Sequence, residues 1–221
     1  MRVRALIFDF DGLVIDSETP LFDIWLEIYR RHGADLTLDA WRHALGTQGG
    51  FDPYADLAAR TGLVLPRDET AAYVRREHIA RCEREPLLAG VSERLAEARG
   101  ARLATAVASS SPRWWVEPWI ERHGLGPSID TICTRDDVAR VKPAPDLFLL
   151  AAERLGVAPA DCVVFEDSPN GVLAARAAGM WAVAVPNLLT RSLSFPDPHL
   201  VLTSLGDLTL DEIVRRLDEF T

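Results

Sequence analysis

The chain has 221 residues, which is enough for one large domain or for one core domain that carries a smaller insertion. Its 24 basic and 33 acidic residues give a net charge of −9, which disfavours a nucleic-acid partner but is compatible with a small anionic substrate, because the field at a site can oppose the net charge. No apolar run reaches the roughly 18 to 20 residues of a membrane span, and the 3 cysteines lack the paired spacing of a disulfide framework or a zinc site, so we expect a cytoplasmic protein with no membrane partner.

The first predicted element is a buried parallel strand over residues 3–8, which ends abruptly in Asp9-Phe10-Asp11-Gly12. The run is apolar and partly β-branched, which is typical of such a strand and unlike an export leader. In open α/β sheets, ligands bind at the carboxyl ends of the strands. Two carboxylates separated by one residue repel each other there unless a cation or a shared proton intervenes, which favours a hard divalent metal. The alternative is that these acids only form a turn with Gly12.

Residues 16–90 contain helix patterns and no strand pattern. Thr19 before Pro20 is the predicted cap of the first helix, and Asp52 before Pro53 is the predicted cap of the third. The predicted helices cover residues 19–33, 38–45, 52–62 and 69–85. A continuous βαβ sheet would not tolerate such an interruption, so we interpret residues 16–90 as an inserted helical domain.

From residue 92 onwards, predicted helices and strands alternate. The strands cover residues 102–107, 129–133, 162–165, 181–185 and 200–203, and the helices cover residues 92–99, 144–155, 170–178 and 211–220. A further helix starts at Ser111 and Pro112 and must kink or restart at Pro118, because an interior proline removes a backbone donor. The alternation predicts a doubly wound parallel sheet, so residues 1–15 and 91–221 form a discontinuous α/β core.

Polar side chains follow four of the predicted strands. They are Asp9 and Asp11, then Ser109 and Ser110, then Lys142, and finally Glu166 and Asp167. The carboxyl ends of parallel strands share one edge of the sheet, so these side chains should converge on one crevice. Gathering four carboxylates there is unfavourable without a ligand, which predicts a functional site.

These motifs, in this order, resemble the haloacid dehalogenase superfamily of phosphohydrolases. The resemblance rests on Asp9-Phe10-Asp11-Gly12, Ser109, Lys142-Pro143 and Glu166-Asp167-Ser168, and it extends over the whole chain. Two longer stretches, residues 142–146 and 166–171, are similar to the β-phosphoglucomutase and phosphoglycolate phosphatase branch. That branch carries a helical cap directly after the first motif, so the resemblance implies a Rossmann-like α/β core with an inserted α-helical cap domain.

The resemblance also implies roles for the strand-end residues in phosphoryl transfer. Asp9 is the implied nucleophile that forms an aspartyl phosphate, and Asp11 is the implied acid and base. Ser109, the backbone N–H of Ser110 and Lys142 would hold the phosphate oxygens.

A magnesium ion is the cofactor that the resemblance implies. The Asp9 carboxylate, the Asp11 carbonyl and Asp167 would hold Mg²⁺, while Glu166 would ligate it directly or through water. Two neighbouring serines are the better helix caps: Ser111 precedes Pro112 and Ser168 precedes Pro169, which leaves Ser109 and Asp167 available for the site.

The implied function is Mg²⁺-dependent hydrolysis of a small phosphomonoester, such as a sugar phosphate, by a monomer. The alternative is a sugar-phosphate mutase of the β-phosphoglucomutase type. The mutase pattern has an arginine soon after the cap glycine and a histidine in the first cap helix. Residues 46–50 contain no arginine, and the cap helix begins Thr19-Pro20-Leu21, so both departures favour hydrolysis.

Other classes fit less well. Dehalogenases of this fold lack the second aspartate, Asp11, and a phosphonatase would want a lysine in the cap, which has none. A phosphorylated receiver domain has similar acids at its sheet edge but no helical insertion, and a silent binding protein would not need all four motifs.

The sequence gives weaker signals for the cap residues that select the substrate. The 6 tryptophans are expected mainly in the core or the cap core, with Trp25, Trp41 or Trp114 as candidates to line the substrate chamber. Arg75 and Arg76 are candidates for an anion contact, although a solvated helix face is the preferred interpretation. Gly49 and Gly50 either let a cap loop approach the core closely or form only a flexible bend. The 5 histidines show no metal spacing and are expected on surfaces or at helix ends.

Overall fold

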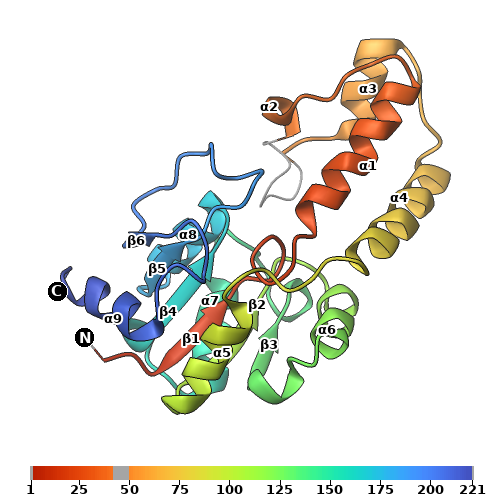
Figure 1. The fold of residues 1–221 in the computed structure, drawn as a ribbon. Coiled ribbons are helices and arrows are strands. Elements are labelled where there is room, and N and C mark those ends of the chain that lie inside the picture. Colours follow the sequence, from red (N-terminus) through yellow and green to blue (C-terminus); the bar gives the residue numbers. More distant parts are fainter. Residues whose placement is uncertain (1, 42–49, 221) are drawn as a thin grey trace.

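The computed structural model describes residues 2–41 and 50–220, which form an α/β core and a group of helices beside it (Figure 1). The expected loop residues Gly46 to Gly49 therefore lie outside the described residues. None of the described helices combines the length and the apolar character that crossing a bilayer requires.

A sheet of six parallel strands forms the centre of the core, in the order β3-β2-β1-β4-β5-β6. The strands are β1 (Ala5–Phe8), β2 (Ala104–Ala108), β3 (Thr131–Cys133), β4 (Cys162–Glu166), β5 (Trp181–Ala184) and β6 (Leu200–Val201). β1 lies between β2 and β4, with Leu6 opposite Thr105 on one side and Val163 on the other. From β1 in the middle of the sheet, β2 and β3 are added on one side and β4, β5 and β6 on the other. This order confirms the doubly wound parallel fold.

Helices cover both faces of the sheet because successive side chains of its strands point to opposite faces. Leu6 and Phe8 pack into one apolar cluster with residues of α5, α6 and α9, whereas Ala5 and Ile7 pack into the other with α7 and α8. The helices of the core are α5 (Val91–Gly100), α6 (Arg113–Arg122), α7 (Asp146–Leu155), α8 (Pro169–Ala177) and α9 (Leu210–Asp218), with short turns at η2 (Gly126–Ser128), η3 (Arg135–Asp137) and η4 (Pro159–Asp161).

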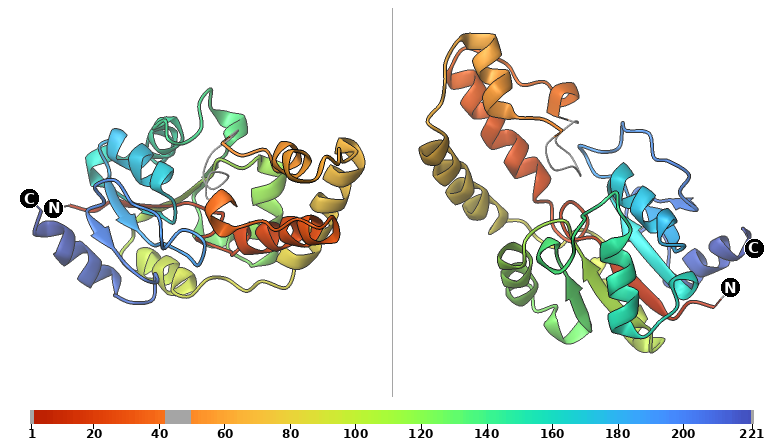
Figure 2. Two further views of the ribbon diagram at one scale, coloured as in Figure 1. Left: turned by 90° about the horizontal axis from the view of Figure 1, so that it is seen from above. Right: turned by 180° about the vertical axis from the view of Figure 1, so that it is seen from behind.

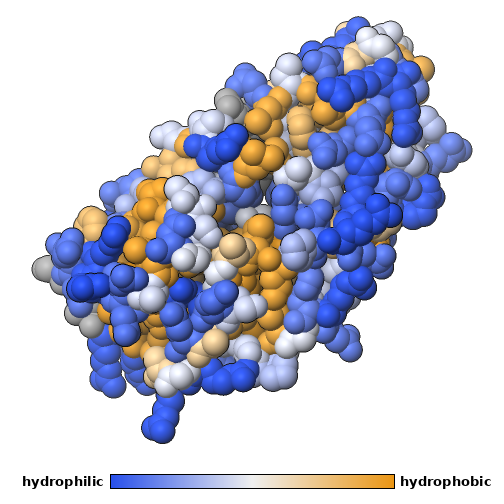
Figure 3. Space-filling model, viewed as in Figure 1, coloured by the Kyte–Doolittle hydropathy of each residue, from blue (hydrophilic) through white to orange (hydrophobic). Residues whose placement is uncertain are grey.

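The remaining helices form the inserted helical cap, which has an apolar core of its own. They are α1 (Glu18–Arg31), α2 (Leu38–Trp41), α3 (Pro53–Thr61) and α4 (Arg67–Cys82). Ile24, Tyr29 and Leu57 are fully buried together in this cap core, while the outer side of the cap around α4 is hydrophilic (Figure 3). The cap is confirmed, and its boundaries at residues 16 and 90 stay a prediction.

Two helix ends follow the sequence prediction. The Asp52 side chain accepts hydrogen bonds from the N–H groups of Tyr54 (2.9 Å) and Ala55 (3.3 Å) at the start of α3. The Ser168 hydroxyl likewise accepts one from Gly171 N–H (3.1 Å) at the start of α8. Both are side-chain caps that satisfy otherwise unpaired backbone donors.

Two other predicted helix starts are wrong. α1 begins at Glu18 rather than after Thr19, and Asp16 accepts the N–H of Thr19 (3.0 Å). α6 begins at Arg113 and has no side-chain cap. The Ser111 hydroxyl instead donates a hydrogen bond to Asp11 Oδ2 (2.5 Å). α6 also runs through Pro118 as one helix instead of restarting there.

The loop after β5 extends from the core to the cap (Figures 1 and 2). Leu189 in this loop is 2% exposed and is buried within the cap core, where Leu193 also packs. A core loop is therefore part of the packing of the cap.

We predict that Leu57→Ala lowers the free energy of unfolding by about 2 to 5 kcal/mol, because it leaves a cavity in the cap core. Leu63→Ala is the matched control, since Leu63 is 39% exposed, and it should change the free energy by less than about 0.5 kcal/mol. Urea denaturation followed by circular dichroism measures both. Equal effects of the two substitutions would contradict a packed cap core.

Candidate active site

The predicted site residues converge at the carboxyl edge of the sheet. Asp9 directly follows β1, Ser109 directly follows β2, and Glu166 ends β4 with Asp167 next to it. Backbone hydrogen bonds continue the sheet past the strand ends: Asp9 N–H donates to Phe165 O (3.0 Å), and Ser109 N–H donates to Cys133 O (2.9 Å). The strand ends are thereby held rigidly next to one another.

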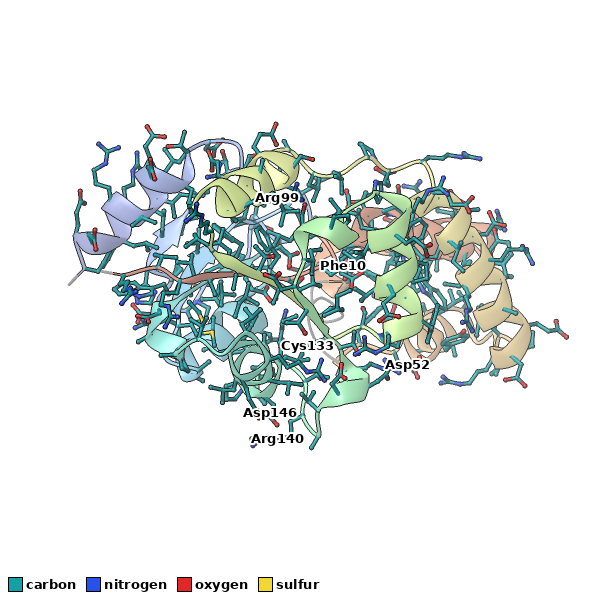
Figure 4. The ribbon with its side chains drawn as sticks, turned by 90° about the horizontal axis from the view of Figure 1, so that it is seen from below. Phe10, Asp52, Arg99, Cys133, Arg140 and Asp146 are labelled. Atoms are coloured by element: carbon teal, nitrogen blue, oxygen red, sulfur yellow. The ribbon has the colours of Figure 1, made fainter. Side chains whose placement is uncertain are left out.

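Lys142 reaches this edge from the loop between β3 and α7. Its Nζ is in direct contact with Asp9 Oδ1 and lies 2.5 Å from Glu166 Oε1. Burial alone would lower the pKa of Lys142, but the two carboxylates outweigh burial and raise it, so the side chain stays an ammonium. Arg140 and Asp146 precede and follow Lys142 in this loop and form an ion pair, with Arg140 Nη2 2.8 Å from Asp146 Oδ1 (Figure 4). The pair links the two ends of the segment that carries Lys142.

Three buried carboxylates gather around this single ammonium. Each of Asp9, Glu166 and Asp167 offers an oxygen within 4.8 Å of those of the other two. Burial, followed by the charge of Glu166, raises the pKa of Asp9 to about 8, and burial followed by Asp9 also raises that of Asp167. One ammonium does not balance three carboxylates, and oxygen donors are the ligands of hard divalent cations, so the cluster fits a metal such as Mg²⁺.

Both oxygens of Glu166 are engaged. Oε1 faces Lys142, while Oε2 accepts hydrogen bonds from the Ser168 backbone N–H (3.1 Å) and hydroxyl (2.9 Å). A Cβ at Gly171 would lie 1.8 Å from Glu166 Oε1, so only glycine fits behind this carboxylate. The first turn of α8, the helix that follows β4, thus packs directly against the Glu166 carboxylate.

Asn187 is a site residue that the sequence analysis missed. From the loop after β5, its Nδ2 donates to Asp167 Oδ2 (2.7 Å) and to the Gly12 carbonyl (3.2 Å). Its own oxygen accepts the N–H groups of Leu189 (2.9 Å) and Thr190 (3.1 Å), which fixes the orientation of the amide. Its position just after a strand of the same sheet was the available signal.

Asp11 accepts four hydrogen bonds. Oδ1 receives the hydroxyl of Ser17 (2.6 Å) and the indole N–H of Trp115 (2.7 Å). Oδ2 receives the hydroxyls of Ser111 (2.5 Å) and Ser109 (3.2 Å). Ser111, the predicted helix cap, is therefore a hydrogen-bond donor to Asp11 instead. Neither Ser17 nor Trp115 was among the predicted site residues.

Ser109 and Ser110 form the turn after β2. Ser109 is 1% exposed, and its hydroxyl also accepts the N–H of Ser111 (2.9 Å). The Ser110 hydroxyl is buried and has no hydrogen-bond partner within residues 2–41 and 50–220. An unpaired buried hydroxyl is unfavourable, so this turn has donor capacity for a ligand.

Comparison with known proteins identifies the chain. The sequence model of the haloacid dehalogenase-like hydrolases matches residues 3–179. The chain belongs to the haloacid dehalogenase-like hydrolase family. The resemblance of the motifs is thereby confirmed, and the protein is a hydrolase.

Named relatives of this hydrolase match along almost its whole length. The candidate phosphatase YhcW of Bacillus subtilis is 41% identical over 98% of this chain and 98% of its own length. Hexitol phosphatase B of Escherichia coli is 34% identical over 97% of this chain and 96% of its own. The crystal structure of CbbY from Rhodobacter sphaeroides in complex with phosphate superposes with a TM-score of 0.77 at 28% identity, covering 98% of this chain and 99% of that one.

A cavity of about 400 Å³ separates the cap from the core of this hydrolase. Its walls include Asp11 and Trp114 from the core, and Glu18 and Arg75 from the cap. Burial, followed by the charges of Asp11 and Asp9, raises the pKa of Glu18 to about 8. The Arg75 guanidinium lies 3.9 Å from the centre of the Trp114 ring, so a cation–π contact joins cap to core here.

Trp25 and Trp41 are 5% and 3% exposed and pack in the cap core, as preferred from the sequence, whereas Trp114 lines the cavity. Arg76 is exposed and lies over the ring of Tyr73, in agreement with a solvated helix face, while Arg75 lines the cavity. One expectation about the cap is wrong. His78 is neither a surface residue nor at a helix end: it lies within α4 and lines the cavity.

We predict that Gly171→Ala lowers the free energy of unfolding by about 1 to 3 kcal/mol, because the added methyl group overlaps Glu166. Gly100→Ala is the control, since it also lies in a helix and a Cβ there meets nothing within 4 Å. It should leave stability unchanged or raise it by up to about 1 kcal/mol. A stable Gly171→Ala variant would show that Glu166 is not held where the geometry puts it.

We predict that Mg²⁺ raises the melting temperature, and more so at higher pH. The pKa of Asp9 in the folded metal-free protein lies above its unfolded value, so stability without metal falls as pH rises from about 4 towards about 8. Mg²⁺ displaces the bound protons, and its contribution therefore grows over the same range. Thermal unfolding with EDTA or excess Mg²⁺, at about pH 6 and about pH 8, measures this. No shift at either pH would count against a metal site.

Proposed function

We propose that this hydrolase is a Mg²⁺-dependent phosphatase that acts on a small phosphomonoester through an aspartyl-phosphate intermediate. The contact of Lys142 with both Asp9 and Glu166, beside Asp167, carries the proposal. It puts a carboxylate at the tip of the central strand, next to fixed positive charge and in a cluster suited to a divalent cation. Phosphoryl transfer needs such an in-line nucleophile within a positive environment.

Asp9 is the proposed nucleophile. Its Oδ1 is held by Lys142, so Oδ2 is the oxygen that attacks phosphorus. The resulting acyl phosphate is readily hydrolysed, which splits one difficult displacement into two easier ones. Lys142 keeps its charge and thereby lowers the repulsion between Asp9 and the incoming phosphate.

Asp9, Asp167 and the Asp11 carbonyl are the proposed ligands of Mg²⁺, with Glu166 acting through water because both of its oxygens are already engaged. When bound, the ion neutralises charge on the transferring phosphoryl group. Asn187 holds Oδ2 of Asp167 and so leaves Oδ1 for the ion.

Asp11 is the proposed proton donor to the leaving alkoxide and, in the second step, the base that activates water. It lines the cavity between cap and core, where the leaving group would lie. Its four hydrogen-bond partners restrain the rotation of the Asp11 carboxylate.

Ser109, the backbone N–H of Ser110 and Lys142 are the proposed phosphate ligands. The Ser109 hydroxyl lies 3.2 Å from Asp11 Oδ2, which is a long contact that a phosphate oxygen would replace easily. The unpaired Ser110 hydroxyl adds donor capacity at the same turn.

The proposed substrate is a small phosphate ester of the sugar or polyol type. The cavity volume of about 400 Å³ is within the range of small-molecule sites, and a relative at 34% identity is named a hexitol phosphatase. A sugar-phosphate mutase is the alternative. A monomer in the cytoplasm, with neither nucleic acid nor membrane as partner, completes the proposal.

We predict that the protein releases phosphate from at least one sugar or polyol phosphate in a Mg²⁺-dependent reaction, and that Asp9→Asn abolishes turnover while the fold is retained. A hydrolysis panel over phosphomonoesters, with circular dichroism of each variant, tests both. Asp68→Asn, an exposed residue of α4, is the control and should keep the wild-type rate. Turnover by Asp9→Asn at the wild-type rate would refute the nucleophile. Faster isomerisation than phosphate release, with β-glucose 1-phosphate and a bisphosphate primer, would favour the mutase.

A further inference from the structure

Asp11 belongs to a closed ring of four residues that joins cap to core. The Ser17 hydroxyl donates to Asp11 Oδ1 (2.6 Å), and the Ser17 carbonyl lies 2.7 Å from His78 Nε2. The His78 imidazole stacks on the Trp115 ring, with centroids 4.6 Å apart and planes at 21°. The Trp115 indole N–H closes the ring by donating to Asp11 Oδ1 (2.7 Å).

The members of the ring come from three different parts of the chain. Asp11 and Ser17 flank the entry into the cap, His78 lies on α4 of the cap, and Trp115 lies on α6 of the core. α4 and α6 are neighbours at the boundary between the two lobes (Figures 1 and 2). These four residues therefore connect the position of the cap on the core to the orientation of the Asp11 carboxylate.

Trp115 differs from the other partners of Asp11. Hydroxyls of Ser17, Ser109 and Ser111 can rotate and can either donate or accept, whereas an indole N–H only donates. Trp115 thus requires a lone pair on Oδ1 in every state of Asp11. Oδ2, which is held only by hydroxyls, is the oxygen that can carry a proton.

His78 fixes the plane of the Trp115 ring. A backbone carbonyl only accepts, so the Ser17 carbonyl assigns the proton of His78 to Nε2. Trp119 also packs against Trp115 in a T-shaped contact, with ring centroids 5.5 Å apart, and Trp115 is only 6% exposed. The indole is thereby clamped with its N–H aimed at Asp11.

We propose that Trp115 is a positioning residue for the proton transfers of Asp11, and that His78 of the cap holds its indole in place. This inference rests on the proposed function, in which Asp11 protonates the leaving group. Without the indole N–H, Oδ1 keeps only the rotatable Ser17 hydroxyl as a partner, so the Asp11 carboxylate, which lines the cavity, is held less firmly in one orientation.

The test is Trp115→Phe, which keeps an aromatic ring against His78 and removes the N–H. With saturating Mg²⁺, kcat/KM is measured for benzyl phosphate, whose alkoxide needs a proton, and for p-nitrophenyl phosphate, whose phenolate leaves without one. kcat/KM reports steps only up to departure of the leaving group. We expect a loss of about tenfold for benzyl phosphate and of less than about twofold for p-nitrophenyl phosphate, as a fraction of a general-acid contribution of about 10²- to 10⁴-fold.

Trp181→Phe is the matched control. Trp181 packs against the same apolar cluster and donates its indole N–H to the Ala160 carbonyl (2.9 Å) at the amino end of β5, so the substitution removes an indole N–H that does not reach Asp11. It should change neither value by more than about twofold. Because the ratio of the two substrates is measured within one preparation, partial misfolding cancels. If Trp115→Phe does not fold, benzothienylalanine at residue 115, which keeps the shape of tryptophan without the N–H, allows the same comparison.

A merely structural role predicts that Trp115→Phe lowers kcat/KM equally for both substrates, and either that result or unchanged values for both would overturn the inference. Asp11→Asn separates the two hypotheses. If Asp11→Asn itself shows no selective loss for benzyl phosphate, the proposed acid role fails and the inference fails with it. If Asp11→Asn shows the loss and Trp115→Phe does not, only the inference fails.

His78→Ala tests the cap half of the proposal. We expect the same selective loss for benzyl phosphate, and we expect the double variant with Trp115→Phe to lose no more than Trp115→Phe does. Independent effects that multiply would show that His78 does not act through Trp115.

Discussion

The site depends on one buried ammonium placed between two buried carboxylates. Lys142 contacts both Asp9 and Glu166, yet Asp167 beside them gives three largely buried carboxylates for one ammonium. Such an arrangement is unfavourable without a further cation. Burial, followed by the charge of Glu166, raises the pKa of Asp9 in the metal-free protein, and a divalent ion would relieve both effects.

The fold concentrates these charges and then shields them. A parallel sheet brings the ends of β1, β2 and β4 to one edge, and an open cavity lies between that edge and the cap. Two connections couple the cap to the chemistry of the core. Leu189 is buried in the cap core while nearby Asn187 holds Asp167, and His78 of the cap stacks on Trp115, which holds Asp11. The position of the cap on the core is therefore linked both to Asp167, a proposed metal ligand, and to Asp11, the proposed proton donor.

The strand ends could be predicted from the sequence because apolar runs stop abruptly at polar residues, and the edge of a parallel sheet is fixed by its topology. Asp9, Ser109, Glu166 and Asp167 were placed at the sheet edge in this way. Lys142 came from the loop that follows a predicted strand, and the helical insertion came from a run of helix patterns with no strand pattern. The partners of Asp11 could not be predicted. Ser111 before Pro112 has the local pattern of a cap, but its hydroxyl donates to the Asp11 carboxylate across the crevice, and α6 begins without a side-chain cap. Trp115, His78 and Asn187 depend on contacts between distant segments, for which no local pattern exists.

The central claim is that Asp9 becomes phosphorylated. Borohydride reduces an acyl phosphate, so quenching the wild-type protein with borohydride during turnover of a phosphomonoester in Mg²⁺, followed by peptide mass spectrometry, locates the intermediate. We expect reduction of residue 9 to homoserine only when substrate and Mg²⁺ are both present, with Asp11 unmodified. Release of phosphate with no reduction at Asp9, or reduction at Asp11 instead, would contradict the proposed chemistry.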